Sequence, residues 1–258
     1  MKVVILAGGY GSRLGEETDV RPKPLVEIGG RPIIWHIMKI YQAHGFNDFI
    51  VCLGYKGHLI KEYFLQLHHQ LSDFTVDIET GRILAVQCRA PPWKVTLVDT
   101  GLDTMTGGRL LRASPYLDEG TFLMTYGDGV GDVNVQALIA AHKAHGKLAT
   151  VTAVQPVGRF GVLHIDAGGI VDKFEEKPAG DGTWINGGFF VLDRRVLTYI
   201  RDGATPWEQE PMLRLAAEGQ LAAYRHRGFW RPMDTLSDKR ALEALWASGN
   251  PPWKIWKD

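Results

Sequence analysis

Apolar runs and segments of helical spacing alternate along the first part of the chain. The runs "KVVILA" (2–7) and "NDFIVCLG" (47–54) are short and continuous, as expected for parallel strands buried on both faces. The segments at 31–45 and 57–69 instead repeat apolar residues at helical spacing, and the first has a proline near its start and a glycine at its end. This order of strand, helix, strand and helix predicts a parallel sheet with crossover helices.

Residues 70 to 95 break this alternation. The segment "FTVDIETGRILAVQCRA" (74–90) reads as two strands about a "TG" turn, so we expect a hairpin insertion at about 72–90. The later pattern predicts strands at 94–100, 121–127 and 147–156, a glycine-rich turn at 105–113, a helix at 133–146, a second hairpin at 160–176 and a C-terminal helical segment at about 236–258. Because no linker, repeat or low-complexity segment interrupts it, the pattern indicates one mixed α/β domain over residues 1–258.

Composition narrows the class of protein. The chain has 258 residues, near the upper end for one α/β domain, and 45% of them are hydrophobic. Basic and acidic residues balance at 29 each, so we expect no general attraction to nucleic acid or to an acidic membrane surface. There is no apolar run of membrane-spanning length and no recognisable signal peptide, and two cysteines do not make a disulfide framework. We therefore expect a cytoplasmic protein.

The loop "LAGGYGSRLGEE" (6–17) follows the first strand and is rich in glycine. It fits a dinucleotide fingerprint poorly, because Leu14 stands where the third glycine is needed, and no lysine completes a Walker loop. Successive glycines nevertheless let backbone N–H groups converge on an anion, and Arg13 adds a charged fork that suits phosphate oxygens. A tight turn alone would need only one or two glycines, so the loop favours anion binding.

A lysine follows this loop within a stiffened segment. In "RPKPL" (21–25), Pro22 and Pro24 restrict the backbone on both sides of Lys23. A lone loop lysine is commonly just solvated. A lysine held in this way, so close in sequence to an anion-binding loop, indicates instead a positioned positive charge.

The two segments together carry a resemblance to a known family. "LAGGYGSRL" followed by "RPKPL" resembles the signature of the sugar-1-phosphate nucleotidyltransferases, whose usual loop reads L-A-G-G-x-G-T-R-L, with Ser12 here in place of threonine. Later motifs follow in the family's order, so the resemblance covers nearly the whole chain. It implies a Rossmann-like nucleotidyltransferase fold, with a mixed, mostly parallel sheet flanked by helices and added β-hairpins. It also implies a nucleotide-binding set of Leu6, Ala7, Gly8, Gly9, Gly11, Ser12, Arg13, Lys23, Thr104, Arg109 and Asp128.

Two carboxylates are candidates for a magnesium site. "TYGDG" (125–129) ends a predicted buried strand, and the carboxyl ends of parallel strands line the ligand crevice of such sheets. Asp128 is therefore placed to hold Mg²⁺, although aspartate is also frequent in ordinary turns. "RPMDT" (231–235) offers Asp234 as a partner. The resemblance implies that Asp128 and Asp234 hold the catalytic magnesium, with Arg13 and Lys23 as the other catalytic residues.

"FEEKP" and "INGGFFVL" resemble the sugar-phosphate side of the family's site. The resemblance implies that Lys177 binds the sugar's phosphate and that Glu176 accepts hydrogen bonds from sugar hydroxyls. Strict strand alternation would pair Lys177 with Glu175 instead, and an ordinary surface ion pair would also explain the charges. Asn186 and Gly188 would supply an amide and a close backbone approach, and the alternative there is a strand bulge.

The segment "DTMTGGRL" (103–110) lies where the family reads the base. Arg109 can donate to O2 and N3 of cytosine but cannot accept the N3–H of uracil or thymine, so it suits cytosine better; a helix-surface arginine is the alternative. "GYKGHLIKEYF", "WEQEPM" and "PMDTLSDK" resemble the branch of the family that uses CTP and glucose 1-phosphate, where the hairpin at 72–90 contributes to subunit contacts. The resemblance therefore implies these two substrates, Mg²⁺ as cofactor and a homo-oligomer.

Two other functions stay open on the sequence. One is a sister enzyme that uses UTP or dTTP with a hexose 1-phosphate. The other is a catalytically silent domain that binds a nucleotide sugar. A silent domain could lose Lys23, Asp128 or Asp234 and still fold, and all three are present. Their presence favours an enzyme.

Overall fold

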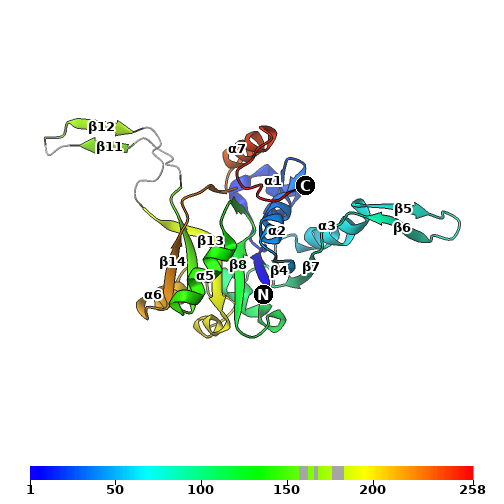
Figure 1. Ribbon diagram of the computed structural model, residues 1–258, viewed down its shortest axis with the longest axis horizontal. Coiled ribbons are helices and arrows are strands. Elements are labelled where there is room, and N and C mark those ends of the chain that lie inside the picture. Colours follow the sequence, from blue (N-terminus) through cyan, green and yellow to red (C-terminus); the bar gives the residue numbers. More distant parts are fainter. Residues whose placement is uncertain (157–161, 166–167, 176–182, 258) are drawn as a thin grey trace.

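A seven-stranded sheet forms the centre of the computed structural model, which describes residues 1–156, 162–165, 168–175 and 183–257 (Figure 1). In spatial order its strands are β14 (Leu221–Arg225), β10 (Ala149–Val154), β13 (Ile185–Asp193), β8 (Thr121–Tyr126), β1 (Val3–Leu6), β4 (Asp48–Leu53) and β7 (Lys94–Asp99). Only β13 runs antiparallel to its neighbours, β10 and β8, whereas the other four pairings are parallel. The expected mixed, mostly parallel sheet is confirmed.

Helices cover both faces of this sheet. Val3 and Ile5 of β1 pack with α2 (Ile33–Ala43) and α5 (Val135–His145), while Val4 and Leu6 pack on the opposite face with α4 (Thr106–Ala113) and α6 (Glu210–Ala217). Since successive side chains of a strand point to opposite faces, both halves of the apolar run "VVIL" are buried. None of the helices in the described part of the chain is long and apolar enough to span a lipid bilayer.

Shorter elements complete the body. Two small sheets pair β2 with β3 and β9 with β15. The bounds of the remaining elements are β2 (Glu27–Ile28), β3 (Arg31–Pro32), β9 (Gly129–Gly131), β15 (Trp230–Pro232), α1 (Glu16–Val20), α7 (Leu236–Ala247), and the 3-10 helices η1 (Ser12–Leu14), η2 (Lys23–Leu25), η3 (Ser114–Tyr116) and η4 (Arg194–Tyr199).

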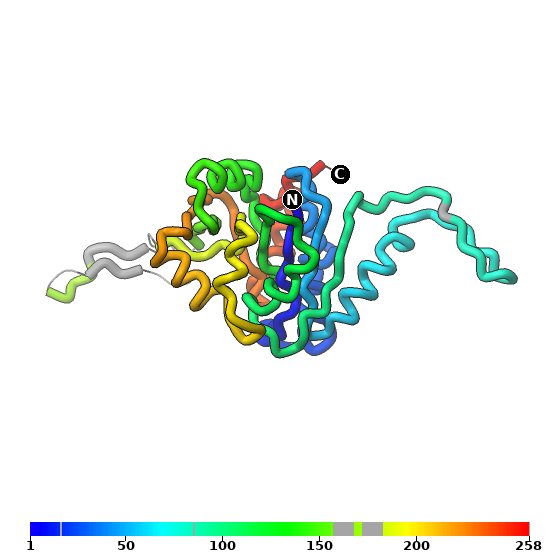
Figure 2. The backbone as a smooth tube through the Cα atoms, turned by 90° about the horizontal axis from the view of Figure 1, so that it is seen from below, coloured from blue at the N-terminus to red at the C-terminus, as the bar shows by residue number. Residues whose placement is uncertain are grey.

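Two hairpins stand out from the body on opposite sides (Figure 1), and Figure 2 shows the hairpin of residues 72–88 extending away from the sheet. One joins β5 (Ser72–Val76) to β6 (Ile83–Cys88) at the end of the long helix α3 (Gly57–Gln70), and the other joins β11 (Val162–Ile165) to β12 (Val171–Glu175). Both were predicted from the sequence as hairpins, and both are confirmed. We refer to α3 with β5 and β6 as the arm.

The segment "MTGGRLLRA" forms helix α4 rather than the predicted glycine-rich turn. Gly107 and Gly108 allow this helix to lie directly against the backbone of residues 203–207. A Cβ at Gly108 would lie 2.2 Å from the carbonyl oxygen of Gly203, and one at Gly107 would lie 2.6 Å from that of Thr205. Paired glycines are usually turn residues, so only the tertiary contact explains why they occur in a helix.

The C-terminal segment is helical only over Leu236–Ala247, less than expected. After this helix the chain packs Trp253 and Trp256 onto α2, where the buried His36 lies among their rings and that of Trp246. The Nε2 atom of His36 lies 2.8 Å from the carbonyl oxygen of Ile28, and Trp253 Nε1 donates to Nδ1 over 3.4 Å. These contacts fit a neutral imidazole with its proton on Nε2.

This buried imidazole predicts a loss of stability in mild acid. Burial lowers the pKa of His36 from 6.5 to about 4, because the charged form would lose its hydration. Between those values the unfolded chain binds a proton that the folded chain does not, so the free energy of unfolding falls as pH falls from about 6.5 toward 4. Measured by urea unfolding, the free energy of unfolding should fall by roughly 2 kcal/mol between about pH 7.5 and about pH 5 because of His36.

The variant His36→Gln should flatten this pH dependence, even if it is less stable at both pH values. The exposed His58 provides the control, since His58→Gln should leave the dependence unchanged. Burial also lowers the pKa values of His44, His142 and His145, so part of the dependence will remain. Equal losses in the wild type and His36→Gln would refute the assignment.

Candidate active site

The parallel topology gathers three loops at one edge of the sheet. They follow the carboxyl ends of β1, β7 and β8, and together they line a pocket of about 530 Å³. Ligand sites of open α/β sheets lie at this edge. All of the predicted nucleotide-binding residues line the pocket, namely Leu6, Ala7, Gly8, Gly9, Gly11, Ser12, Arg13, Lys23, Thr104, Arg109 and Asp128.

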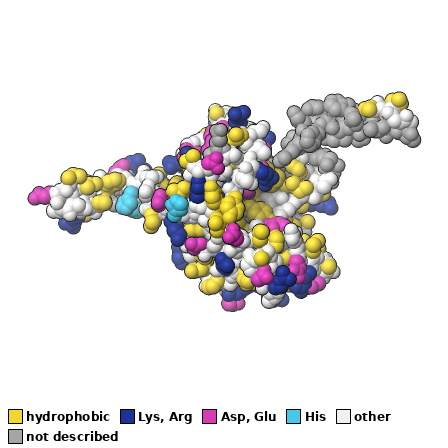
Figure 3. Space-filling view, turned by 180° about the vertical axis from the view of Figure 1, so that it is seen from behind, with side chains coloured by type: hydrophobic (Ala, Val, Ile, Leu, Met, Phe, Trp, Pro, Cys, Tyr) yellow, Lys and Arg dark blue, Asp and Glu magenta, His cyan; other side chains and the backbone are white. Residues whose placement is uncertain are grey.

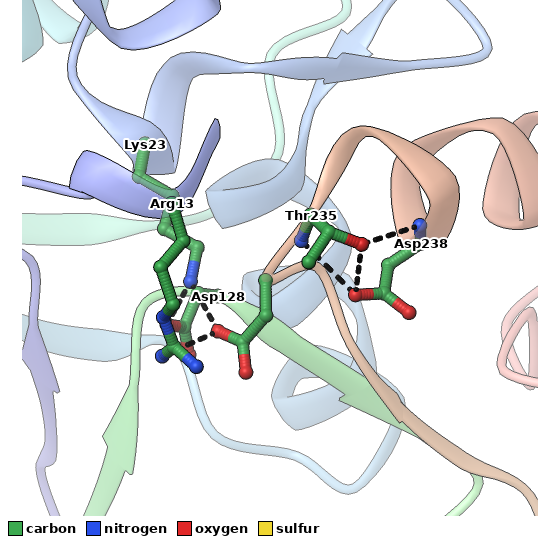
Figure 4. A network of polar contacts seen from close by, with 6 residues as sticks. Arg13, Lys23, Asp128, Thr235 and Asp238 are labelled. Carbon is green, nitrogen blue, oxygen red and sulfur yellow. Dashed lines mark hydrogen bonds and ion pairs between the residues drawn. The ribbon is translucent and has the colours of Figure 1, made fainter. Parts of the chain in front are cut away.

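Lys23 lies between the two predicted magnesium ligands. Its Nζ atom is 2.6 Å from Asp128 Oδ2 and 2.8 Å from Asp234 Oδ1, and its side chain is only 10% exposed. Arg13 Nη2 donates to the same oxygen of Asp234 over 3.0 Å, from a largely exposed side chain. Figure 4 shows Arg13 and Lys23 reaching into the same group of carboxylates. The four residues predicted to be catalytic thus form one cluster.

A strand pairing and a helix cap bring Asp234 to this cluster. Strand β15 pairs with β9, and the backbone N–H of Met233 donates to the carbonyl oxygen of Asp128 over 2.8 Å. Thr235 and Asp238 then form a capping box at the start of α7, each side chain accepting from the other's backbone N–H (Figure 4). Asp234 lies between a paired strand and a capped helix, so its backbone is held on both sides.

The glycine-rich loop passes close to Lys23. Gly11 adopts a left-handed conformation with φ of 66°, and a Cβ there would lie 3.0 Å from both Lys23 Cβ and Thr18 Cγ2. At Gly9, by contrast, a Cβ would meet no atom within 4 Å, so the pocket is open beside this residue. Gly11 is needed for the turn and for the close approach to Lys23. Gly9 instead leaves the backbone free to approach a ligand.

Arg109 has a different environment from the one its predicted role requires. Its side chain is buried, and its two terminal nitrogens donate to five protein oxygens: those of Leu53, Gly101, Gly8 and Leu102, and the hydroxyl of Thr100. A Cβ at Gly8 would lie 2.2 Å from its Nη1. Arg109 therefore ties together the loops that line the pocket, and its two terminal nitrogens could donate to a base only by giving up one of these partners.

The predicted sugar-phosphate side of the site is described only in part. Glu176 and Lys177 lie outside the described residues. Asn186 and Gly188 lie on β13, where the side-chain oxygen of Asn186 accepts from the backbone N–H of Gly188 over 2.9 Å. Asn186 Nδ2 also donates to the hydroxyl of Tyr126, which lines the pocket, over 3.1 Å. These residues thus adjoin the pocket across β8.

One contact across the pocket has no counterpart among the features predicted from the sequence. Tyr10 and Asp103 both line the pocket, and the Tyr10 hydroxyl donates to Asp103 Oδ1 over 3.0 Å. This hydrogen bond raises the pKa of Tyr10. The two residues are 93 positions apart, so only the topology shows that they meet. Tyr10 occupies the variable position of the glycine-rich motif, and nothing in the local pattern marks it.

The donor set is compatible with Mg²⁺. In the part of the chain that the structure describes, no group of three or more His, Cys, Asp or Glu side chains could hold a metal ion. Asp128 and Asp234 nevertheless converge on one cation, the Lys23 ammonium. Mg²⁺ commonly takes one or two protein carboxylates and completes its shell with water and substrate phosphates. A pair of carboxylates beside the glycine-rich loop, for which we predict anion binding, fits that pattern.

Comparison with known proteins shows the family of this chain. Residues 2–246 match the family described as Nucleotidyl transferase. The chain is 58% identical to the glucose-1-phosphate cytidylyltransferases of Salmonella typhi and Salmonella typhimurium, over 258 residues and 100% of both chains in each case. The crystal structure of HddC from Yersinia pseudotuberculosis shares the fold, with a TM-score of 0.70, 21% identity, and 95% of this chain and 99% of that chain covered. This chain therefore belongs to the nucleotidyl transferase family.

Proposed function

We propose that this protein transfers a cytidylyl group from CTP to α-D-glucose 1-phosphate, giving CDP-glucose and pyrophosphate. The observation that carries the proposal is the placement of Lys23 between Asp128 and Asp234, at the edge of a pocket built from the glycine-rich loop. The full-length 58% identity to glucose-1-phosphate cytidylyltransferases supports the choice of base and sugar. We also propose that residues 1–258 form one catalytic domain.

The reaction depends more on aligning two polyanions than on a general base that removes a proton. A phosphate oxygen of glucose 1-phosphate forms a bond to the α-phosphorus of CTP, and the bond from that phosphorus to the β-phosphate oxygen breaks, releasing pyrophosphate. The sugar phosphate is already an anionic nucleophile, so no proton has to be removed. The protein's task is to hold the reactants in line and to offset their repulsion.

Each charged side chain of the cluster has a part in this task. The glycine-rich loop and Arg13 bind the triphosphate, and Lys23 stabilises the negative charge that passes to the leaving pyrophosphate. Asp128 and Asp234 would hold Mg²⁺, which when bound supplies charge neutralisation between the two phosphate groups. In this role Lys23 exchanges its present carboxylate partners for phosphate oxygens.

The proposed contacts to base and sugar extend the site on both sides. Thr104 and Arg109 lie on the nucleotide side, and Arg109 would read cytosine by exchanging one of its present acceptors for O2 or N3 of the base. For the sugar, Lys177 would bind the phosphate and Glu176 the hydroxyls, with Asn186 and Gly188 as further proposed contacts.

Pyrophosphate release tests the function directly. The protein is assayed with glucose 1-phosphate and Mg²⁺ and with CTP, UTP, dTTP, ATP or GTP offered separately. Release with CTP alone is the expected result. Equal release with UTP or dTTP would keep the chemistry but overturn the choice of base. No release with any nucleotide, from protein shown to be folded, would replace the enzyme with a nucleotide-sugar-binding domain.

We further propose that the protein is a homo-oligomer assembled through the arm. Large apolar side chains are exposed along it, with Ile78 at 87%, Leu65 at 73% and Val86 at 72% exposure. In Figure 3 hydrophobic side chains gather on the arm, away from the body of the molecule. Soluble monomers rarely expose a continuous apolar surface of this kind, and a second copy of the chain would cover it.

Charged substitutions on the arm should therefore reduce the size of the particle in solution. Leu84 and Val86 both lie on β6, and both are exposed. The variant Leu84→Asp with Val86→Asp is expected to lower the mass measured by light scattering after gel filtration. Leu213→Asp, at a residue of α6 that is 69% exposed, is the control and should leave the mass unchanged. A monomeric wild type would exclude this assembly.

We place the protein in the cytoplasm on two grounds. Cys52 and Cys88 are both free thiols, as expected in a reducing compartment. Its proposed substrates are cytoplasmic metabolites. Neither nucleic acid nor a membrane is a partner in this proposal.

A further inference from the structure

A chain of hydrogen bonds passes from β13 to the start of α4 behind the pocket. Asn186 Nδ2 donates to the hydroxyl of Tyr126 over 3.1 Å, and that hydroxyl donates to Glu208 Oε1 over 2.6 Å. The other oxygen of Glu208, Oε2, accepts from the hydroxyl of Thr106 over 2.6 Å. Tyr126 and Thr106 line the pocket, whereas Glu208 contacts both without lining it. Glu208 therefore joins the two sides of the site.

The directions of these hydrogen bonds follow from the chemistry of their members. A carboxylate only accepts, so the single proton of the Tyr126 hydroxyl must point to Glu208. The lone pairs of that hydroxyl are then free to accept from Asn186. The backbone N–H of Trp207 donates to the Thr106 hydroxyl over 2.8 Å. The hydroxyl proton of Thr106 therefore also points to Glu208. One carboxylate thus sets the orientation of two hydroxyl groups.

The same logic fixes the amide of Asn186. Its oxygen accepts from the backbone N–H of Gly188 over 2.9 Å, and one N–H of Nδ2 is used by Tyr126. The flipped amide would lose both hydrogen bonds, so only one orientation is supported. In that orientation the second N–H of Nδ2 is the donor that remains for a ligand.

We propose that Glu208 is a positioning residue for the sugar phosphate, which it serves by holding Tyr126 as an acceptor for Asn186. This inference rests on the proposed function, in which Asn186 lies on the sugar side. Without the Glu208 carboxylate, the Tyr126 hydroxyl is free to turn and donate to Asn186 Oδ1, which favours the flipped amide. The donor meant for the sugar would then face away from it.

The electrostatics around Tyr126 agree with this arrangement. Burial, together with the charge of Glu208 and the hydrogen bond to it, raises the pKa of Tyr126, so its proton stays in place over the whole working range of pH. The hydrogen bond to Glu208 is charge-assisted, a class roughly twice as strong as neutral pairs. Losing it should cost about tenfold in affinity for the sugar phosphate.

Steady-state kinetics with CTP and glucose 1-phosphate provide the test, accompanied by calorimetric titration of glucose 1-phosphate. We expect Glu208→Ala to raise KM and Kd for glucose 1-phosphate about tenfold, with KM for CTP and kcat within about threefold of wild type. Glu208→Gln should largely restore both values, because its amide oxygen still accepts from Tyr126 while its NH₂ group donates to Thr106. Glu218→Ala is the matched control, because Glu218 accepts from the Tyr199 hydroxyl on the protein surface.

Tyr126→Phe separates positioning from direct contact. If Glu208 acts through Tyr126, this variant shows the same rise in KM, and combining it with Glu208→Ala adds little further. Tyr126→Phe also carries the test if Glu208→Ala proves unfolded by circular dichroism. An unchanged KM in Glu208→Ala, or a normal Tyr126→Phe beside an impaired Glu208→Ala, would overturn the inference. Failure of the proposed function itself would look different, since the wild type would then release no pyrophosphate from CTP.

Discussion

Replacing Lys23 with methionine is expected to lower kcat by about a hundredfold or more, because the leaving pyrophosphate loses a preorganised positive charge. Methionine keeps the length and apolar volume of the side chain, so the buried stem still packs beside Gly11 of the glycine-rich loop. The rate is measured as pyrophosphate release at saturating CTP and glucose 1-phosphate. KM for either substrate should change less than kcat, since the charge matters most as the phosphorus–oxygen bond breaks.

A second effect of Lys23→Met is expected on thermal stability. Without the ammonium, Asp128 and Asp234 face each other with no shared cation, so Mg²⁺ should raise Tm more in the variant than in the wild type. Lys143→Met, at an exposed position of α5, is the control for both measurements. A variant that turns over CTP at the wild-type rate would remove Lys23 from the catalytic residues.

Asp234→Asn should produce the other large effect. The change preserves shape but removes a carboxylate that contacts both Lys23 and Arg13, and it leaves Asp128 as the single predicted protein ligand of Mg²⁺. We expect kcat to fall about a hundredfold or more and the apparent affinity for the metal to fall about tenfold or more. Titration with Mn²⁺, followed by electron paramagnetic resonance in the absence of substrates, reads the metal affinity without relying on turnover.

The capping box makes the result interpretable. Thr235 and Asp238 hold the start of α7 without help from the Asp234 side chain, so the fold around the site should survive. Asp118→Asn is the control, because Asp118 forms its ion pair with Lys2 at the surface of the protein. If Asp234→Asn bound Mn²⁺ as tightly as the wild type, Asp234 would not be a metal ligand.

Local sequence pattern was sufficient for much of the fold and for one wall of the site. The buried strands, the helices α2, α3 and α5, and both hairpins follow from apolar spacing and turn residues, which act within a few positions of each other. The glycine-rich loop and the proline-flanked Lys23 are equally local, since backbone freedom and stiffness belong to the residues themselves. Asp128 could be placed because strand ends line the crevice of a parallel sheet.

Other features depend on contacts between distant segments. Helix α4 contradicts the turn propensity of its two glycines because residues 203–207 lie where side chains would otherwise be. The environment of Arg109 also depends on contacts between distant segments. A pattern can show that an arginine is present, but whether it donates to a ligand or to the backbone depends on which carbonyl groups surround it.

The sequence by itself thus determined the mixed, mostly parallel sheet and the glycine-rich loop, and it supplied the charged residues that we predict to take part in phosphate chemistry. Only the tertiary structure decided how those charges meet. The pairing of β9 with β15 brings Asp234 to Lys23, and the loop that follows η4 brings Glu208 to Tyr126. The physical reason is that propensity and periodicity act over a few residues, whereas a site of this kind is closed by strand pairing between segments far apart in the chain.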